Sequence, residues 1–587
     1  MKSSKRLVIS IGVVALFLGF ALMPAKITGV QSVRAVSPTP AGPVSGDRSY
    51  HPPPLSGIFQ AASNFANDST APGQGAITKS FCTNGTDLGG GNIRINCDSA
   101  KLPHNELSIA VDPANPNHIV AGSNDYELFS IPGASGFLQK IIAGYYTSTD
   151  GGTTWLNGHI DPGGFFFSGD PSIAFNKKLG LVHYATVGFN LGAGGAFTVP
   201  TVQVNTSRDG GLTFERPTVV AHGTGSRLVQ IFNDKPYIAV DNNSGSPHYG
   251  RLYVTCTRFE FFGASQSGYF RSPILFSYSD DGGNSFSDPK EISGSSATLC
   301  HNPGISSNED VCNENQDSVP AVGPDGTLYV AFENGEFEGS AHGFRDQYLV
   351  VRSTDGGQTF QGPFQAVFPI FDGNDDYPRN MEGRQTLSNS QFRVNSAGNI
   401  TVDPTSGPAP GSTNLYIAFS DNRNGTLTGD FNTVATNTDI VVVKSSSGGT
   451  SWNAPVVLTS ARDQFYPWVA VGLDGNLRVA FSDRNYDPSN IQYGETLASS
   501  FDGGISFSLL RVDTGLSNPN DSRFQTEITK TSTTNGKALF IGDYNGLDIG
   551  SDLVMHPAWT DMRTTAYTNP PPGTGHKTQD AVTASVP

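Results

Sequence analysis

One eight-residue phrase occurs six times in this chain and constrains its fold more than any other feature. It is first seen as STDGGTTW at residues 148–155. The other copies are SRDGGLTF (207–214), SDDGGNSF (279–286), STDGGQTF (353–360), SSSGGTSW (445–452) and SFDGGISF (500–507). Self-similarity of this kind is the sequence signature of a repeat architecture. We therefore expect a chain built from similar units.

Each copy, termed a box, has the composition of a tight turn. The Gly-Gly pair permits a positive φ, the Asp before it can accept hydrogen bonds from backbone N–H groups of its own turn, and the closing Trp or Phe is a large apolar anchor. Strand-like residues precede each box, which predicts a hairpin between two antiparallel strands. Ser447 replaces the Asp in the fifth box. A turn acceptor tolerates that exchange at about 1 kcal/mol, but a catalytic carboxylate would not, so we interpret the box aspartates as structural.

A second, longer repeat lies upstream of the boxes and consists of a strand, a turn and another strand. The seven instances span 105–126, 169–189, 233–259, 316–335, 393–423, 463–485 and 541–563. With the strands on either side of a box, each unit supplies four antiparallel strands, and four-stranded sheets repeated radially form a β-propeller. We predict an all-β propeller of seven blades. Six blades remain the alternative if the fifth or last unit is not a true blade.

The last unit lacks a fourth strand of its own. The segment GNIRIN (91–96), near the N-terminus, is strand-like and could close the ring by supplying it.

Composition agrees with many short strands and turns. Charged residues make up 15% of the 587, and the chain contains 68 Gly and 38 Pro. The net charge of −16 lacks the basic footprint of a nucleic-acid-binding protein, so nucleic acid is not expected as a partner. The acidity suits neutral or cationic partners.

The N-terminus has the organisation of an export signal. A basic start precedes an uncharged, mostly apolar run from Leu7 to Met23. We predict a signal peptide over 1–35, with Ala25 as the other cleavage site and an uncleaved membrane anchor as the alternative. A Pro/Gly-rich arm follows at 36–100, and the propeller occupies 101–587. The expected location is extracellular or in the cell envelope, and the expected state is a monomer.

The five cysteines fit an exported protein. Cys82 with Cys97 and Cys300 with Cys312 are candidate disulfides, and Cys256 is expected to be a buried free thiol in a strand. The odd count and loose spacing argue against a zinc site.

Strand direction gathers acidic residues at one end of the predicted ring, opposite the boxes. The acids that begin first strands are Glu106, Asp170, Asp234, Asp317, Asp463 and Asp543. The acids that end second strands are Asp125, Glu333, Asp421, Asp483 and Asp561. The sequence thus predicts an acidic ring around one mouth of the channel.

Arginines and aromatic residues accompany these acids in the later units. Together they have the chemistry of a sugar site, with carboxylates as acid, base or hydroxyl acceptors and arginines for a substrate carboxylate. The catalytic candidates are Asp561, Arg563, Asp543, Tyr544 and Asp483, and the substrate-binding candidates are Arg423, Asp421, Arg484, Tyr466 and Trp559. The alternative is structural: the acids cap turns, and Asp-x-Arg is a local ion pair.

The boxes and their preceding strands resemble the bacterial neuraminidase repeat, or Asp box, of the sialidase superfamily, over roughly residues 105–510. The ending GDYNG…HPAWTDMR resembles the closing unit of exported sialidase-like propellers. The resemblance implies a propeller fold. If it extended to the sialidase active site, the resemblance would further imply an arginine triad, an acid/base Asp and a Tyr nucleophile helped by a Glu. The Phe/Tyr-Arg-Ile-Pro motif of that family is absent here, and the nearest string is FRSP at 270–273.

Two functions follow from these patterns. One is a secreted, exo-acting glycoside hydrolase whose partner is an extracellular glycan or glycoprotein. The other is a non-catalytic carbohydrate- or protein-binding propeller, or an envelope scaffold. No cofactor and no metal ligand is assigned. A structural calcium at the acidic mouth is the one cation considered, although no compact loop guarantees its six to eight oxygen ligands.

Overall fold

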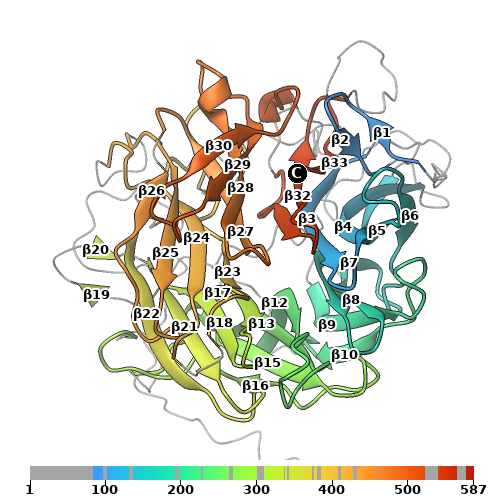
Figure 1. Cartoon of the computed structure of the whole chain (residues 1–587), viewed down its shortest axis with the longest axis vertical. Coiled ribbons are helices and arrows are strands. Elements are labelled where there is room, and N and C mark those ends of the chain that lie inside the picture. The colour runs from blue at the N-terminus through green and yellow to red at the C-terminus, as the bar shows by residue number, and fades with distance from the viewer. Residues whose placement is uncertain are drawn as a thin grey trace, which may run out of the picture. The chain divides into compact units, whose positions relative to one another are not determined.

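Seven antiparallel sheets follow one another around a ring in the computed structural model of the chain (Figure 1). The structure describes residues 84–587 apart from 97–101, 131–136, 192–196, 226–228, 263–268, 301–309, 336–337, 340–342, 345, 373–375, 380–384, 408–410, 428–432, 459, 522–539 and 565–576. These residues belong to one unit, 50–587. The predicted signal peptide and most of the predicted arm lie outside the described residues.

Each sheet is one blade, and the first three occupy the first half of the chain. Blade 1 contains β3 (His104–Asp112), β4 (Asn115–Ser130), β5 (Phe137–Ser148) and β6 (Leu156–His159). Blade 2 contains β7 (Phe167–Asn176), β8 (Leu181–Leu191), β9 (Phe197–Ser207) and β10 (Thr218–Ala221). Blade 3 contains β12 (Val229–Val240), β13 (Leu252–Phe262), β15 (Ile274–Ser279) and β16 (Lys290–Glu291), with β11 (Thr224–Gly225) and β14 (Tyr269–Arg271) paired to it.

The remaining blades repeat this order. Blade 4 contains β17 (Asn315–Val322), β18 (Leu328–Asn334), β21 (Asp346–Ser353) and β22 (Gln361–Ile370), and β19 (Glu338–Gly339) pairs with β20 (Gly343–Phe344) beside it in sequence. Blade 5 contains β23 (Asn399–Val402), β24 (Leu415–Asp421), β25 (Asp439–Ser445) and β26 (Val456–Leu458). Blade 6 contains β27 (Gln464–Val471), β28 (Leu477–Asp483), β29 (Gly494–Ser500) and β30 (Ser508–Arg511). Two short 3₁₀ turns, η3 (Arg484–Tyr486) and η4 (Pro519–Asp521), follow β28 and β30.

Blade 7 joins the two ends of the propeller. It contains β31 (Gly546–Ile549), β32 (Met555–Asp561) and β33 (Asp580–Ala584), and then β2 (Asn92–Arg94) and β1 (Thr86–Asp87) from the start of the described chain. Ile93 pairs with Thr583 across β2 and β33. The strand in GNIRIN therefore takes the place of the fourth strand, and the prediction of a seven-bladed all-β propeller is confirmed.

The boxes are hairpin turns between the third and fourth strands. In the first box, the Ser148 hydroxyl oxygen accepts from Gly152 N at 2.9 Å, and Asp150 accepts from Thr154 N at 2.8 Å. Trp155 is fully buried and donates its indole N–H to Gly152 O. Two anchors therefore hold the turn, one polar and one apolar.

The fifth box shows that the Asp is a turn acceptor. Ser447 Oγ accepts from Ser451 N at 2.9 Å and lies 2.8 Å from Ser451 Oγ. These are the two contacts that Asp makes with Thr or Ser in the other boxes, for example Asp355 with Thr359. A hydroxyl can thus replace the carboxylate, as the exchange at this position predicted.

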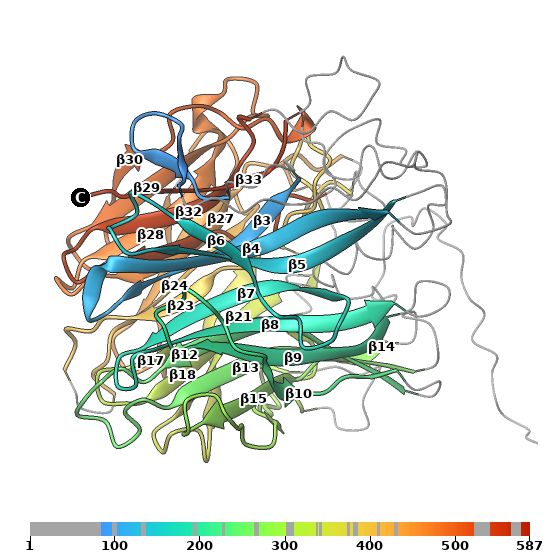
Figure 2. The same cartoon turned by 90° about the vertical axis from the view of Figure 1, so that its right-hand side faces the viewer.

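Neighbouring blades are also joined at the boxes. In four boxes, the carbonyl of the first glycine accepts a hydrogen bond from a side chain of the preceding blade. The pairs are Ser585–Gly151, His118–Gly210, Arg251–Gly356 and Arg352–Gly448. Since Ser585 follows β33, the C-terminus lies at the box end, on the left in Figure 2. The opposite end, where the first strand of each blade begins, is termed the mouth end.

Two of the cysteine predictions can be compared with the structure. Cys300 and Cys312 form a disulfide. Cys256 is a buried free thiol in β13, and burial raises its pKa to about 12. Cys82 and Cys97 lie outside the described residues. In the described part of the chain, no helix has the length and apolarity to cross a membrane.

Candidate functional site

The first strands of five blades share a local distortion near the mouth end. One non-glycine residue in each has a positive φ, between 46° and 57°, and lies at a break in register with the second strand. These residues are Glu106, Asp170, Lys235, Asp317 and Tyr466. Such a conformation costs on the order of 1–3 kcal/mol for a residue with a side chain, and it tends to persist where function requires it. Four of the five side chains are acidic or basic.

These residues belong to a polar cluster to which every blade contributes. Its members, termed the axial cluster, are Glu106, Asp170, Asp234, Lys235, Asp317, Arg393, Tyr466 and Asp543. Lys235 of blade 3 and Arg393 at the start of blade 5 both contact Asp543 at the start of blade 7. Contacts between blades that are not neighbours require the side chains to meet near the axis of the ring.

Two cations hold Asp543 in its ionised form. Arg393 Nε donates to Oδ1 at 3.0 Å, Arg393 Nη2 donates to Oδ2, and Lys235 Nζ lies 2.9 Å from Oδ2. The same ammonium lies 3.0 Å from Asp317. Burial by itself would raise the pKa of Asp543, but Arg393 and Lys235 outweigh it and lower the pKa to about 2. A charged carboxylate therefore persists in the interior at neutral pH.

A row of three carboxyl groups lies beside this ion network. Asp170 forms side-chain hydrogen bonds with Glu106 and with Asp234. Burial, and then the charge of Asp543, raises the pKa of Glu106 to about 7, and the pKa of Asp170 is raised well above its ordinary value by burial and its acidic neighbours. A hydrogen bond between two carboxyl groups needs a proton, so this row holds protons at neutral pH.

An amide and an aromatic group adjoin the cluster. Asn124 donates to Glu106 Oε2 at 2.7 Å and accepts from Asp170 N at 2.9 Å, which links blades 1 and 2. Tyr237 stacks on Trp468 at a centroid distance of 5.3 Å and meets Tyr544 edge-on at 5.8 Å. Tyr237 and Trp468 lie two residues beyond Lys235 and Tyr466 along their strands, so an aromatic layer follows the charged one.

The structure brings three of the ten predicted site residues together here. Asp543 and Tyr466 are members of the axial cluster, and the hydroxyl of Tyr466 donates to Arg393 O at 2.8 Å. Tyr544 belongs to the aromatic layer and donates to Pro171 O at 3.1 Å. Their catalytic and binding roles stay predictions.

Two Asp-x-Arg motifs form local ion pairs instead. Arg423 Nε and Nη2 each lie 2.8 Å from an oxygen of Asp421. Arg563 Nε lies 2.8 Å from Asp561 Oδ2, and the indole of Trp559 donates to the same oxygen at 3.2 Å. This arrangement is the structural alternative that the sequence left open.

Arg484 and Asp483 are likewise engaged within blade 6. Arg484 is fully buried and lies 3.3 Å from Asp463. Asp483 caps η3 by accepting from Asn485 N at 2.8 Å, and its other oxygen accepts from the Thr496 hydroxyl at 2.9 Å. Neither residue contacts the axial cluster through these bonds.

Lys235 and Arg393 are the two members of the axial cluster to which the pattern of acidic and aromatic residues does not point. Lys235 follows the acid in NDKPY, and Arg393 begins the fifth unit, where the other units have an acid. A cation in a position otherwise acidic is the available signal, but it does not reveal that both cations share Asp543.

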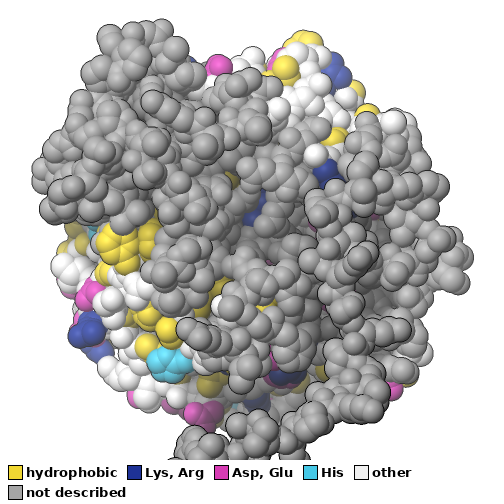
Figure 3. Space-filling view, turned by 180° about the vertical axis from the view of Figure 1, so that it is seen from behind, with side chains coloured by type: hydrophobic (Ala, Val, Ile, Leu, Met, Phe, Trp, Pro, Cys, Tyr) yellow, Lys and Arg dark blue, Asp and Glu magenta, His cyan; other side chains and the backbone are white. Residues whose placement is uncertain are grey.

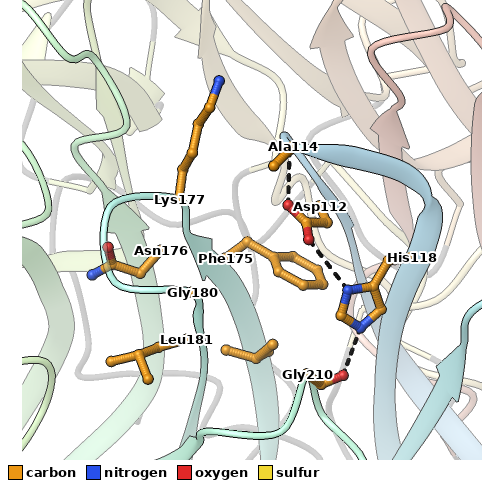
Figure 4. A pocket seen from close by; sticks show the side chains of 10 residues that line it. Asp112, Ala114, His118, Phe175, Asn176, Lys177, Gly180, Leu181 and Gly210 are labelled. Atoms are coloured by element: carbon orange, nitrogen blue, oxygen red, sulfur yellow. Dashed lines mark hydrogen bonds and ion pairs between the residues drawn. The ribbon is translucent and has the colours of Figure 1, made fainter.

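The mouth end presents mixed side chains on its described surface, and the box end contains a small pocket. Figure 3 shows the ring from the mouth end, and on its described part side chains of both charges stand among apolar ones. At the box end, a pocket of about 80 Å³ lies between blades 1 and 2 (Figure 4). His118 bridges Asp112 and Gly210 O there, at 3.2 and 2.6 Å. Because the pocket is small and the polar groups of His118 and Asp112 are paired within it, we interpret it as part of the packing between blades 1 and 2.

Metal binding has no geometric support in the described ranges, where no group of three or more His, Cys, Asp or Glu side chains is arranged to hold an ion. The expectations of no cofactor and of a structural calcium stay predictions.

Comparisons with known proteins concern the fold. No protein-family model and no curated protein sequence matches the chain. Similar solved structures include a protein of unknown function from Dyadobacter fermentans DSM 18053, at 16% identity over 67% of this chain and 93% of that one, with a TM-score of 0.38. The Hadza microbial sialidase Hz136 is 12% identical over 89% of this chain and 98% of its own, with a TM-score of 0.39. The GH93 alpha-L-arabinofuranosidase of Fusarium graminearum is 12% identical over 84% and 97%, with a TM-score of 0.38.

Sialidases are thus among the similar structures, as the resemblance read from the boxes predicts. At these scores the likeness carries no argument about activity, and the fold assignment rests on the order of the strands.

Proposed function

We propose that this protein is an exported, glycan-directed propeller that hydrolyses glycosidic bonds at its axial cluster. The observation that carries the proposal is the convergence of at least one polar side chain from every blade, five of them on strained backbone. Buried charges and positive φ values both destabilise a fold. A closed ring needs neither, so the arrangement is better explained by chemistry.

The cluster contains both carboxyl states that glycosidic hydrolysis requires. One group must donate a proton to the leaving oxygen, and another must be ionised. Glu106, with its pKa raised to about 7 by burial and by Asp543, can give and take a proton near neutral pH. Asp543 supplies a permanently ionised carboxylate in the same network. We assign Glu106, with Asp170, as the proton-transferring pair.

The aromatic layer suits a sugar partner. Tyr237, Trp468 and Tyr544 present apolar faces next to the charged groups, the combination of apolar lining and a few polar groups that ligand sites use. The proposal includes a mature protein outside the cell that acts as a monomer on an extracellular glycan or glycoprotein and needs no catalytic cofactor.

A second candidate is a non-catalytic binding propeller or envelope scaffold. Its support is the pairing of charges at the mouth end: Asp421 with Arg423, Asp561 with Arg563, and Asp463 with Arg484. In a scaffold each charge would be satisfied by its partner in such a pair, and no protonated acid would be required.

A hydrolysis assay on a panel of mixed glycans, including fluorogenic sialosides, distinguishes the glycoside hydrolase from the non-catalytic propeller. We expect wild-type protein to release reducing sugar from at least one glycan, and Glu106→Gln to be slower by about 100-fold or more. Asp150→Asn, in a box, is the matched control and should retain activity. An inert wild type would favour the scaffold, and full activity in Glu106→Gln would place the proton donor elsewhere.

A further inference from the structure

Resting on the proposed function, we infer that the site takes glycans without carboxylates, uncharged or amine-bearing, and discriminates against carboxylated sugars. Four described arginines at the mouth end are already paired with aspartates, and this pairing bears on the charge that a substrate can carry.

Four arginines at this end are each bound to an aspartate. The pairs are Arg393–Asp543, Arg423–Asp421, Arg484–Asp463 and Arg563–Asp561. Recognition of a substrate carboxylate relies on the planar guanidinium fork with two N–H donors free to bind it. In Arg393 and Arg423, both Nε and Nη2 already donate to the carboxylate of the paired aspartate.

Burial makes these pairs costly to exchange. The side chains of Arg393 and Arg484 are 2% and 0% exposed, and those of Asp543 and Asp463 are fully buried. An incoming carboxylate would have to displace the internal one and leave a buried negative charge without its partner, which is strongly unfavourable.

Three further basic side chains among the described residues of this end bind other groups of the protein. Arg258 donates to Asn233 Oδ1, Arg462 to the carbonyl of Asp487, and Lys577 to the carbonyl of Arg563. They belong to separate parts of the ring, in blade 3, before blade 6 and in blade 7, so they do not form a common anion site.

Acidic groups, by contrast, are in excess around the axis. Besides the row of Glu106, Asp170 and Asp234, a second carboxyl pair lies next to Asp317: Ser396 Oγ donates to Glu333 at 2.6 Å and Ser396 N donates to Asp372 at 2.9 Å. Carboxyl groups accept hydrogen bonds from the hydroxyl or amine groups of a sugar, which suits an uncharged or amine-bearing ligand.

Binding to matched glycans tests the inference. The probes are cellohexaose, the chitosan hexamer and the β-1,4-glucuronic acid hexamer, which share a backbone and differ in charge, together with an array of sialylated glycans and their desialylated counterparts. For each matched set that binds, we expect the carboxylated member to be at least about ten-fold weaker than the uncharged one at low salt. Equal or tighter binding of carboxylated members would overturn the inference and leave the proposed function standing. Absence of binding to every glycan would overturn the proposed function itself.

Two variants test the reason given for the selectivity. Asp421→Asn and Asp561→Asn release Arg423 and Arg563 from their partners, and each should reduce the discrimination against carboxylated glycans by about three-fold or more. Asp150→Asn, at the box end, should leave it unchanged, and thermal unfolding verifies that each variant is folded. Folded variants with wild-type discrimination would contradict the role of the arginine pairs.

Discussion

The two ends of the ring shift the pKa of an acidic side chain in opposite directions. Asp355 lies in a box at one end, and Glu106 lies in the axial cluster at the other. Burial, the largest single influence on Asp355, raises its pKa, but the hydrogen bonds from Thr359 and Ser353 in its own turn together outweigh burial and lower the pKa to about 2. The pKa of Glu106 is raised to about 7 by burial and by Asp543, which comes from another blade. Partners within a few residues stabilise the charged form, whereas convergence of acids from many blades stabilises the neutral one.

This difference separates structure from chemistry in a repeated fold. The boxes can recur because the hydrogen bonds of each turn are made within the turn itself. One box even has Ser447 in place of the Asp. The axial cluster is made once, by the whole ring, and Lys235 and Arg393 have no equivalent at the matching positions of the other blades. The unique part of a repeat protein is where a single reaction can be placed.

The largest expected effect comes from Arg393→Met. It leaves Asp543 buried with Lys235 as the one remaining cation among its described contacts, so the free energy of unfolding should fall by about 3–5 kcal/mol. Arg208→Met is the matched control, since Arg208 pairs with Glu215 on the exposed side of a box and should change stability by less than about 1 kcal/mol. Denaturant unfolding measures both. Similar losses in the two variants would show that burial of the pair does not matter.

The pH dependence of stability gives the next largest effect. The folded pKa of Glu106, about 7, is above its ordinary value of 4.5, so the folded state keeps a proton that the unfolded state has released. Its contribution is therefore complete below pH 4.5 and is lost as the pH rises through 7. Asp543 acts in the opposite sense, since its lowered pKa contributes above 3.8 and is lost as the pH falls toward 2.

The variant Glu106→Gln removes the contribution of Glu106 to the pH dependence of stability. Relative to the variant, wild-type protein should lose stability on the order of a few kcal/mol between pH 4.5 and 8. The measurement is denaturant unfolding across that range. Parallel curves for the two proteins would mean that Glu106 titrates like an exposed acid.

The smallest effect is expected at a box. Asp355→Ala removes an acceptor whose partners can turn to water, at a cost of about 1 kcal/mol, and Asp355→Ser should recover part of that loss, as Ser447 does naturally. Thermal unfolding of the two variants checks the order. If Asp355→Ser were the less stable of the two, the box would need a carboxylate after all.

The sequence predicts most of the fold because its determinants are local. The boxes, the strand pairs on either side of them and the seven units depend on residues close together in the chain, and the structure has the seven blades. The strand around Ile93 could be proposed for blade 7 since that blade was one strand short.

The site is less predictable because its contacts are not local. Pairs two residues apart, such as Asp421 with Arg423, can be anticipated as ion pairs. The joining of Lys235, Arg393 and Asp543 depends on how seven blades close around the axis, and no spacing in the sequence expresses it. Positive φ at Glu106 is equally hidden, since an acid there gives no sign of strain.

Lys235 and Asp543 couple blades 3 and 7 across the ring, and a double-mutant cycle between them tests this coupling most directly. The unfolding free energies of Lys235→Met, Asp543→Asn and the double variant give the interaction between blades 3 and 7. We predict a coupling of about 1.5 kcal/mol or more, with the double variant more stable than the sum of the single losses implies. Additivity within about 0.5 kcal/mol would contradict a shared axial network.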